Sequence, residues 1–211
     1  MVGGANMIDK IECDKKYGCD SNEYLIELLN HIQNTTEDIP DFISKQEYLE
    51  VKGNKNNYPI WYQGLIGFCS FGCKYWGGFM ASHKGEIKGE RTKSYFSSIK
   101  KQSKLLKGIN FKCCSFQDIN TNISDYVIYC DPPYRGTTKY KTDEFPYEEY
   151  YDWCRKMSKN NIVLCSEYNM PDDFECIWEI ETKANFDSNR NSSDEKNKRV
   201  EKLFMVKGGK R

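Results

Sequence analysis

The sequence predicts an α/β fold built around a mostly parallel sheet, and three observations support this class. Residues 126–130 and 161–165 are short apolar runs with the length of buried strands. Segments with helical periodicity separate such runs, and this alternation is typical of parallel sheets. The chain has 211 residues, of which 38% are hydrophobic, and this length is sufficient for one α/β domain that carries an inserted lobe.

In the first part of the chain, a helix is expected from about Ser21. Its apolar residues are spaced along a single helical face: Tyr24, Leu25, Leu28, Leu29 and Ile32. A polar connection around residues 53–57 leads to a segment rich in aromatic residues and glycine, residues 61–79. A second helix is expected over residues 91–107.

In the second part, the strand at residues 126–130 is followed by an expected helix at residues 146–158, which has a proline near its first turn. The strand at residues 161–165 comes next. Residues 175–182 and 201–206 have the composition of strands and are joined by a polar loop. We expect these last two strands to pair antiparallel.

The tetrapeptide Asp131-Pro132-Pro133-Tyr134 directly follows the first of these apolar runs. Open α/β sheets bind their ligands at the carboxyl ends of their strands, so this position is a candidate site. The tetrapeptide suits chemistry on an amino group attached to a flat ring. The lone pair of such a nitrogen is delocalised into the ring, and acceptors for its hydrogens would make it available to attack.

Asp131 can accept one of these hydrogen bonds through its carboxylate, and the carbonyl of Pro132 can accept another. Tyr134 can stack on the ring, and stacking contributes about 1–3 kcal/mol per base. Stacking would help to offset the few kcal/mol that flipping a base out of a duplex costs. The alternative is a strand that ends in a proline turn, with Tyr134 packing on the surface.

Other segments extend the pattern in both directions. They are Val2-Gly3-Gly4-Ala5-Asn6-Met7, Tyr17-Gly18-Cys19-Asp20-Ser21-Asn22, Phe111-Lys112-Cys113-Cys114-Ser115-Phe116, Ser188-Asn189-Arg190 and Val200-Glu201-Lys202-Leu203-Phe204. Together with Asp131-Pro132-Pro133-Tyr134, they make the chain resemble the Dam-like (D12 class) DNA adenine-N6 methyltransferases. The resemblance implies a Rossmann-like, S-adenosylmethionine-dependent methyltransferase fold. It also implies transfer of a methyl group to N6 of adenine in double-stranded DNA.

The same resemblance implies which residues bind S-adenosylmethionine. Gly3 and Gly4 would form its glycine-rich loop, since glycines let the backbone approach a ligand closely. Asp20 would accept hydrogen bonds from the two ribose hydroxyls. Ser115 and Phe116 would border its adenine. The alternatives are an N-cap of the following helix for Asp20 and core packing for Phe116.

The family has a strand before the glycine-rich loop, and this sequence starts inside the loop. We therefore expect the first wall of the cofactor pocket to be missing, with a separate upstream chain as one possible source. A truncated or inactive methyltransferase that only binds nucleic acid is an alternative function. Methylation of another amino group, such as cytosine N4 or RNA adenine, is a second alternative.

A local basic stretch lies between residues 84 and 107, although the whole chain balances 31 basic against 31 acidic residues. The family has its target-recognition insert at this position. We therefore expect residues 35–107 to form an inserted helical DNA-recognition lobe, and residues 1–34 with 108–211 to form the catalytic and cofactor-binding domain. The candidate DNA-binding residues are Lys93, Lys100, Lys101, Lys104 and Arg135. A solvated helix face is the alternative for the lysines, and a surface salt bridge for Arg135.

The ten cysteines are scattered, with no Cys-x-x-Cys pair. We expect reduced thiols and no metal site. No secretory signal or membrane-spanning run is evident, so a cytoplasmic protein is expected. By its resemblance, the chain would flip its target base and serve a phage or bacterial restriction-modification system.

Overall fold

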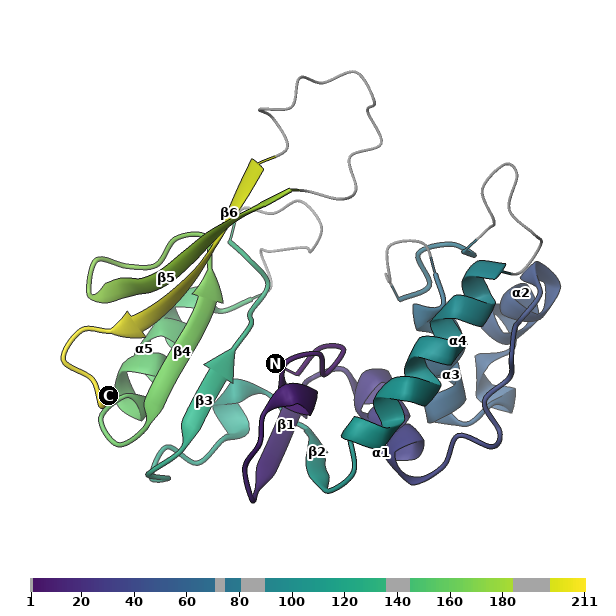
Figure 1. The fold of residues 1–211 in the computed structure, drawn as a ribbon, viewed down its shortest axis with the longest axis horizontal. Coiled ribbons are helices and arrows are strands. Elements are labelled where there is room, and N and C mark those ends of the chain that lie inside the picture. The colour runs from purple at the N-terminus through teal and green to yellow at the C-terminus, as the bar shows by residue number, and fades with distance from the viewer. Residues whose placement is uncertain (1, 71–74, 81–89, 136–144, 184–197) are drawn as a thin grey trace. The chain divides into compact units, whose positions relative to one another are not determined.

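A computed structural model of the chain describes residues 2–70, 75–80, 90–135, 145–183 and 198–211 (Figure 1). Two parts of the sequence interpretation lie outside these residues: Lys84 and Lys88 of the basic stretch, and the segment Ser188-Asn189-Arg190. The chain divides into two compact units, which we call the N-terminal half (Val2–Ser115) and the C-terminal half (Phe116–Arg211).

The N-terminal half combines helices with one pair of parallel strands. Its elements are η1 (Ile8–Lys10), β1 (Lys16–Asp20), α1 (Glu23–Asn34), α2 (Lys45–Gly53), η2 (Lys55–Asn57), α3 (Ile60–Phe68), α4 (Glu90–Gln102), η4 (Ser103–Leu105) and β2 (Ile109–Cys113). β1 and β2 pair in parallel, with Gly18 opposite Phe111. A Cβ atom at Gly18 would lie 2.7 Å from the Phe111 ring, so glycine is needed here for the ring to lie against β1.

Helix α1 supplies much of the core of this half, as its apolar spacing predicts. Ile26, Leu28, Leu29 and Ile32 are buried on one face. Its N-cap is Asn22, whose side chain accepts a hydrogen bond from the backbone N–H of Leu25 at 3.2 Å. The alternative that Asp20 caps this helix is therefore wrong. Asp20 lies before the capping position, and its carboxylate binds other groups.

Helices α1 and α3 pack very closely at Gly64. A Cβ atom there would lie 2.2 Å from the carbonyl oxygen of Tyr24 in α1. Only glycine lets the two backbones approach this closely. The expected helix at residues 91–107 is confirmed as α4 with the short η4 turn at its end.

The C-terminal half is a four-stranded sheet with one helix of eleven residues. Its elements are η5 (Phe116–Asp118), β3 (Val127–Cys130), α5 (Tyr147–Met157), β4 (Ile162–Glu167), β5 (Phe174–Lys183) and β6 (Lys198–Val206). The strand order is β3-β4-β6-β5. β3 and β4 are parallel, whereas β6 is antiparallel to both of its neighbours.

These pairings confirm the closing antiparallel strands but do not confirm a mostly parallel sheet, because two of the four described strand pairs are antiparallel. The described strands form two sheets, each with one parallel pair. β5 and β6 follow each other in the chain and pair from Phe174 opposite Val206 to Lys183 opposite Lys198, and this hairpin arrangement is necessarily antiparallel.

Helix α5 packs on the sheet of the C-terminal half (Figure 1). Tyr151, Cys154 and Met157 of the helix are buried in one core with Val163 of β4 and Phe204 of β6. Acidic residues in its first turn and basic residues in its last turn both favour the helix dipole. No helix within the described ranges is long and apolar enough to cross a membrane.

The close approach at Gly64 predicts a large difference between two glycines. Gly64→Ala should lower the free energy of unfolding by about 1–3 kcal/mol, because the new methyl group forces α1 and α3 apart. Gly53→Ala is the control, since a Cβ atom at this last residue of α2 meets nothing within 4 Å. That change should be neutral or stabilising by up to about 1 kcal/mol. Denaturant unfolding measures both, and an equal decrease in the two variants would contradict this account of the packing.

Candidate active site

The tetrapeptide Asp131-Pro132-Pro133-Tyr134 leaves the carboxyl end of β3, as predicted. β4 runs parallel to β3, with Cys165 opposite Cys130. Because of this register, the chain that follows Cys130 and the end of β4, Ser166 and Glu167, lie at the same edge of the sheet. Asp131 is exposed, Pro132 is buried and Tyr134 is half-buried.

Side chains from other elements hold the tetrapeptide at Pro133 and at Tyr134. The hydroxyl of Tyr147, in the first turn of α5, donates a hydrogen bond to the carbonyl of Pro133 at 2.8 Å. The hydroxyls of Tyr134 and Ser166 lie 2.5 Å apart and hydrogen bond to each other. Tyr168 meets the Tyr134 ring edge-on, with centroids 4.6 Å apart. Tyr147 was not a candidate in the sequence, because nothing in its local pattern indicates this contact.

The two acceptors that the chemistry requires differ in their surroundings, since Asp131 lies on the surface and Pro132 is buried. Within the described residues, the Pro132 carbonyl accepts no hydrogen bond, whereas the Pro133 carbonyl is already bound. Although Asp131 is exposed as a residue, the protein around its carboxyl partly desolvates it and raises its pKa, and the negative charge of Glu201 raises the pKa further, while the Tyr134 hydroxyl lowers it. A carboxylate with a raised pKa is a more basic hydrogen-bond acceptor. The edge therefore offers two oxygen acceptors beside an aromatic ring.

Arg135 follows the tetrapeptide directly and is exposed. Its guanidinium forms an ion pair with Glu148 at 3.5 Å and lies over the Tyr147 ring, 5.4 Å from the centroid. The surface salt bridge that was the alternative for this residue is present. An exposed pair of this length is weak, so it does not prevent a phosphate contact.

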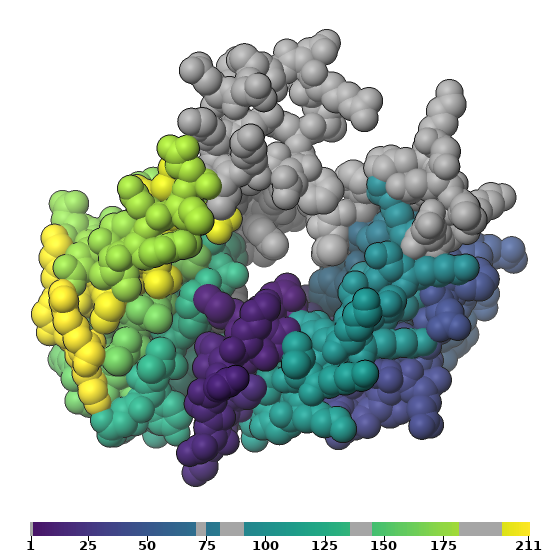
Figure 2. Space-filling view, viewed as in Figure 1, coloured from purple at the N-terminus to yellow at the C-terminus, as the bar shows by residue number. Residues whose placement is uncertain are grey.

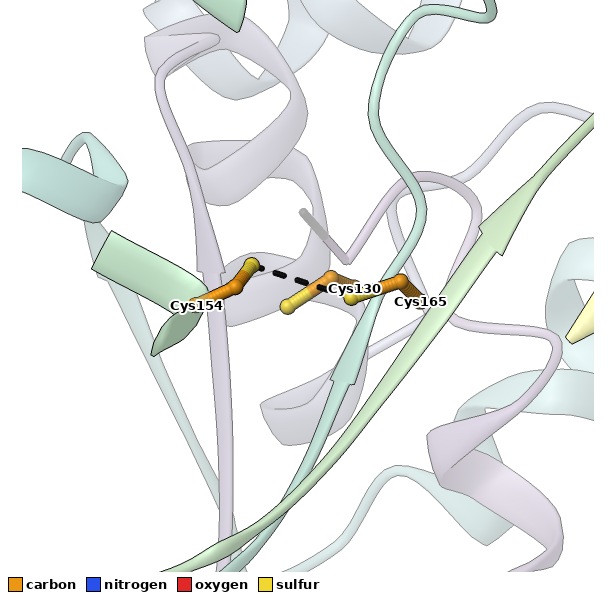
Figure 3. Close-up of side chains that lie close together, drawn as sticks. All are labelled: Cys130, Cys154 and Cys165. Carbon is orange, nitrogen blue, oxygen red and sulfur yellow. Dashed lines mark hydrogen bonds between the residues drawn. The ribbon is translucent and has the colours of Figure 1, made fainter. Parts of the chain in front are cut away.

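Three buried cysteines lie directly behind the strand end (Figure 3). Cys130, Cys154 and Cys165 come from β3, α5 and β4, and their sulfur atoms all lie within 4.8 Å of one another. Thiols are ligands that soft metal ions prefer. The Cys154 and Cys165 thiols are 3.7 Å apart and hydrogen bond to each other, and all three cysteines belong to the buried core that α5 forms with the sheet. We therefore interpret the cluster as core packing that supports the position of Asp131.

In the N-terminal half, the structure brings together the residues expected to hold the cofactor. The Asp20 carboxylate, at the end of β1, accepts hydrogen bonds from the backbone N–H of Gly3 at 3.2 Å and of Asn22 at 3.0 Å. Gly3 has a φ of 49° and Ala5 a φ of 59°. This left-handed backbone favours glycine, as found at Gly3. Gly4 lies between them in the same turn. A hydrogen bond from the N–H of Ala5 to the carbonyl of Val2 closes this turn.

The remaining cofactor candidates, Ser115 and Phe116, follow β2. The Phe116 ring packs against Phe145, Tyr150 and Trp153, with centroids 5.6–5.9 Å apart. This is the core packing that was the alternative for Phe116. A cofactor contact of either residue stays a prediction.

The four candidate lysines lie along one groove of the N-terminal half. The groove is lined by Thr36, Asp41, Lys93, Ser97, Lys100, Lys101 and Lys104. Five of these residues come from α4 and the η4 turn that follows it, and α4 forms a surface ridge in Figure 2. Lys100 pairs with Asp41 at 2.8 Å, and this contact lowers the pKa of the Asp41 carboxyl. The spacing of these four lysines along the chain already places them on one helical face, whereas the contribution of Thr36 and Asp41 to the groove could not be read from the sequence.

The packing role of the three buried cysteines can be tested by substitution. Cys154→Ser should lower the free energy of unfolding by about 1–3 kcal/mol, because it buries a hydroxyl where a weakly polar thiol was. Cys13→Ser is the control at an exposed cysteine and should change it by less than about 0.5 kcal/mol. Denaturant unfolding measures both. A lower stability of the unmodified protein after treatment with a zinc chelator would instead indicate a structural metal.

Comparison with known proteins identifies the family. A family model described as D12 class N6 adenine-specific DNA methyltransferase matches residues 78–198, which is more than half of the chain. The matched residues include Asp131-Pro132-Pro133-Tyr134, α4 and the four lysines, whereas Gly3, Gly4 and Asp20 precede them. No curated protein matches the chain. The chain belongs to the D12 class of N6 adenine-specific DNA methyltransferases, enzymes that transfer a methyl group from S-adenosylmethionine to N6 of adenine in DNA.

Proposed function

We propose that Asp131-Pro132-Pro133-Tyr134 binds the adenine that this enzyme methylates. The observation that carries the proposal is the pair of acceptors at the end of β3: the carboxylate of Asp131, and the Pro132 carbonyl, which accepts no hydrogen bond from the described residues. An exocyclic amine has two hydrogens to donate, and these two oxygens are one residue apart. The neighbouring Tyr134 ring supplies a surface for stacking.

Asp131 acts on the electronics of the amine. By accepting a hydrogen bond from N6, its carboxylate increases electron density on the nitrogen, and the Pro132 carbonyl does the same from the second hydrogen. S-adenosylmethionine supplies a methyl group that its sulfonium already activates. Methylation would leave a positive charge on N6, which would then have to lose a proton. The Asp131 carboxylate stabilises that charge and can receive the proton.

Tyr134 would hold the adenine ring in a fixed plane. Its hydroxyl is tied to Ser166 and its ring is met by Tyr168, so its rotation is restricted before the base arrives. Burial raises the pKa of the Tyr134 phenol, which keeps it protonated at neutral pH. A preorganised ring loses less entropy on stacking, and this would help to offset the cost of base flipping.

Gly3, Gly4 and Asp20 would hold the cofactor. The turn that contains Gly3 is anchored to the Asp20 carboxylate, so loop and strand end are fixed to each other. Each carboxylate oxygen has accepted one backbone hydrogen bond and retains capacity for another, which suits two ribose hydroxyls. The residues present therefore fit S-adenosylmethionine. A cofactor contact of Ser115 and Phe116 stays a prediction.

The groove along α4 would bind the DNA backbone. Its four lysines, with the hydroxyls of Thr36 and Ser97, are the groups that phosphates prefer. This placement supports residues 35–107 as the DNA-recognition lobe, with residues 1–34 and 108–211 as the catalytic domain. Arg135 is a further candidate beside the target base. Base flipping, restriction-modification and a cytoplasmic location stay predictions.

The chemistry depends on Asp131. Asp131→Ala should lower the rate of methyl transfer to unmethylated genomic DNA by roughly 10²–10³-fold, because one preorganised acceptor of the transition state is removed. Binding of S-adenosylmethionine, measured by calorimetry, should change much less. Asp172→Ala is the matched control, since this exposed carboxylate lies in the same half and its side chain contacts neither acceptor. Full activity of Asp131→Ala would remove Asp131 from the mechanism.

The raised pKa of Asp131 also predicts a pH dependence. The ionised carboxylate is the active form, so activity should fall as the pH drops through this raised pKa. The acid limb of kcat/KM should therefore lie above the ordinary aspartate pKa of about 3.9. The limb should persist in Glu167→Gln, which removes the neighbouring carboxyl that titrates with a raised pKa. A limb at or below the ordinary aspartate value would contradict the assignment.

The lysine groove predicts a change in the salt dependence of DNA binding. Replacing Lys100, Lys101 and Lys104 by alanine should weaken binding and reduce the logarithmic salt slope by about 0.9 for each phosphate that is no longer neutralised. Replacing Lys156, Lys159 and Lys207, three exposed lysines of the C-terminal half, removes the same charge and should have a smaller effect. Asp41→Asn should tighten binding, because it frees Lys100 from its ion pair. An unchanged slope in the first variant would reject the groove as the DNA site.

A further inference from the structure

Glu167 is a buried carboxylate with an unusual position. It ends β4, next to Ser166, and only 1% of its surface is exposed. Among the described residues it is the only charged side chain in the buried class. Removing a carboxylate from water costs several kcal/mol unless hydrogen bonds compensate. The residue therefore requires specific partners, and they identify what it does.

Those partners are two backbone N–H groups. Oε2 of Glu167 accepts a hydrogen bond from the N–H of Arg135 at 3.0 Å, and Oε1 accepts one from the N–H of Tyr168 at 2.7 Å. Burial raises the pKa of the Glu167 carboxyl, and these two hydrogen bonds and the charge of Arg135 lower it. The Arg135 guanidinium makes its own ion pair with Glu148 instead. Glu167 thus acts on backbone positions rather than as half of a salt bridge.

The two anchored positions flank one pair of aromatic rings. Arg135 directly follows Tyr134, so fixing its N–H fixes the peptide plane at the end of the tetrapeptide. The other anchored N–H belongs to Tyr168, whose ring meets Tyr134 edge-on. One carboxylate therefore sets the distance between the two backbones that carry these rings. Ser166, its neighbour in β4, holds the Tyr134 hydroxyl.

The geometry points to Glu167 as a positioning residue for the target base, which holds the Tyr134 ring through the backbone of Arg135 and Tyr168. This inference rests on the proposed role of Asp131-Pro132-Pro133-Tyr134. Glutamine cannot replace it fully, because its amide has one acceptor oxygen and turns its NH₂ donors toward the second N–H. Removal of one anchor loosens Tyr134, and a shift of about 1 Å in a positioning group can cost roughly 10²-fold in rate.

The test separates positioning from folding and from cofactor binding. Glu167→Gln should lower kcat for methyl transfer to unmethylated genomic DNA by roughly 10²-fold. The dissociation constant of S-adenosylmethionine, measured by calorimetry, and the thermal unfolding profile should stay close to those of the unmodified enzyme. Glu167→Asp, which keeps the charge but shortens the reach, should retain more activity than Glu167→Ala. Glu179→Gln on β5 is the matched control at an exposed glutamate and should leave kcat unchanged.

Hydrogen exchange provides a second readout, and its first part uses only the unmodified enzyme. In the unmodified enzyme, the amides of Arg135 and Tyr168 should exchange as slowly as those inside β4, and Glu167→Gln should speed exchange at one or both. Rapid exchange at Arg135 in the unmodified enzyme, or full kcat in a folded Glu167→Gln variant, would overturn the inference. If Asp131→Ala is also fully active, the proposed base site itself has failed. If Asp131→Ala is inactive and Glu167→Gln is fully active, only the role of Glu167 has failed.

Discussion

The parallel pairing of β3 and β4 is the constraint on which the candidate active site depends. Its register, with Cys130 opposite Cys165, puts Asp131 at the same edge as Ser166 and Glu167. A slip of one residue would turn every side chain of the strand to the other face. If β3 slipped, the Cys130 thiol would leave the core, where it packs with Cys165 of β4 and Cys154 of α5. Core packing behind the strands therefore fixes the register, and the register fixes the position of the acceptors.

Asp131 and Glu167 show how one sheet edge gives two carboxylates different roles. Both have raised pKa values with burial as the main cause, and the charge of Asp131 contributes to the raised pKa of Glu167. Glu167 is almost fully buried, and both of its oxygens are occupied by backbone N–H groups. Asp131 is exposed and is the carboxylate that a ligand can reach. Environment, more than residue type, thus separates an acceptor for the ligand from an anchor for the backbone.

The sequence was sufficient for what depends on local pattern. The strand before Asp131, the closing antiparallel pair and the face of α1 that includes Leu28 and Leu29 follow from periodicity and turn residues, and the structure confirms them. Contacts between distant segments could not be read in this way. The hydrogen bond from Tyr147 to Pro133 and the anchoring of Arg135 by Glu167 join residues 14 and 32 positions apart. For the same reason, the sequence did not show that Thr36 and Asp41 line the groove of the four lysines, or that the described strands form two separate sheets.

Helix α4 contributes to two proposed sites that lie far apart in the sequence: the lysine groove and the glycine-rich turn. Its exposed face contributes lysines to the groove. At its carboxyl end, the side-chain amide of Gln102 donates hydrogen bonds to the carbonyl of Gly4 at 2.8 Å and to the carboxylate of Asp9 at 3.0 Å. The glycine-rich turn is thus held by Asp20 from β1 and by Gln102 from α4. Within this half, the lysine groove and the proposed cofactor loop therefore share one element, since α4 lines the groove and holds Gly4 through Gln102.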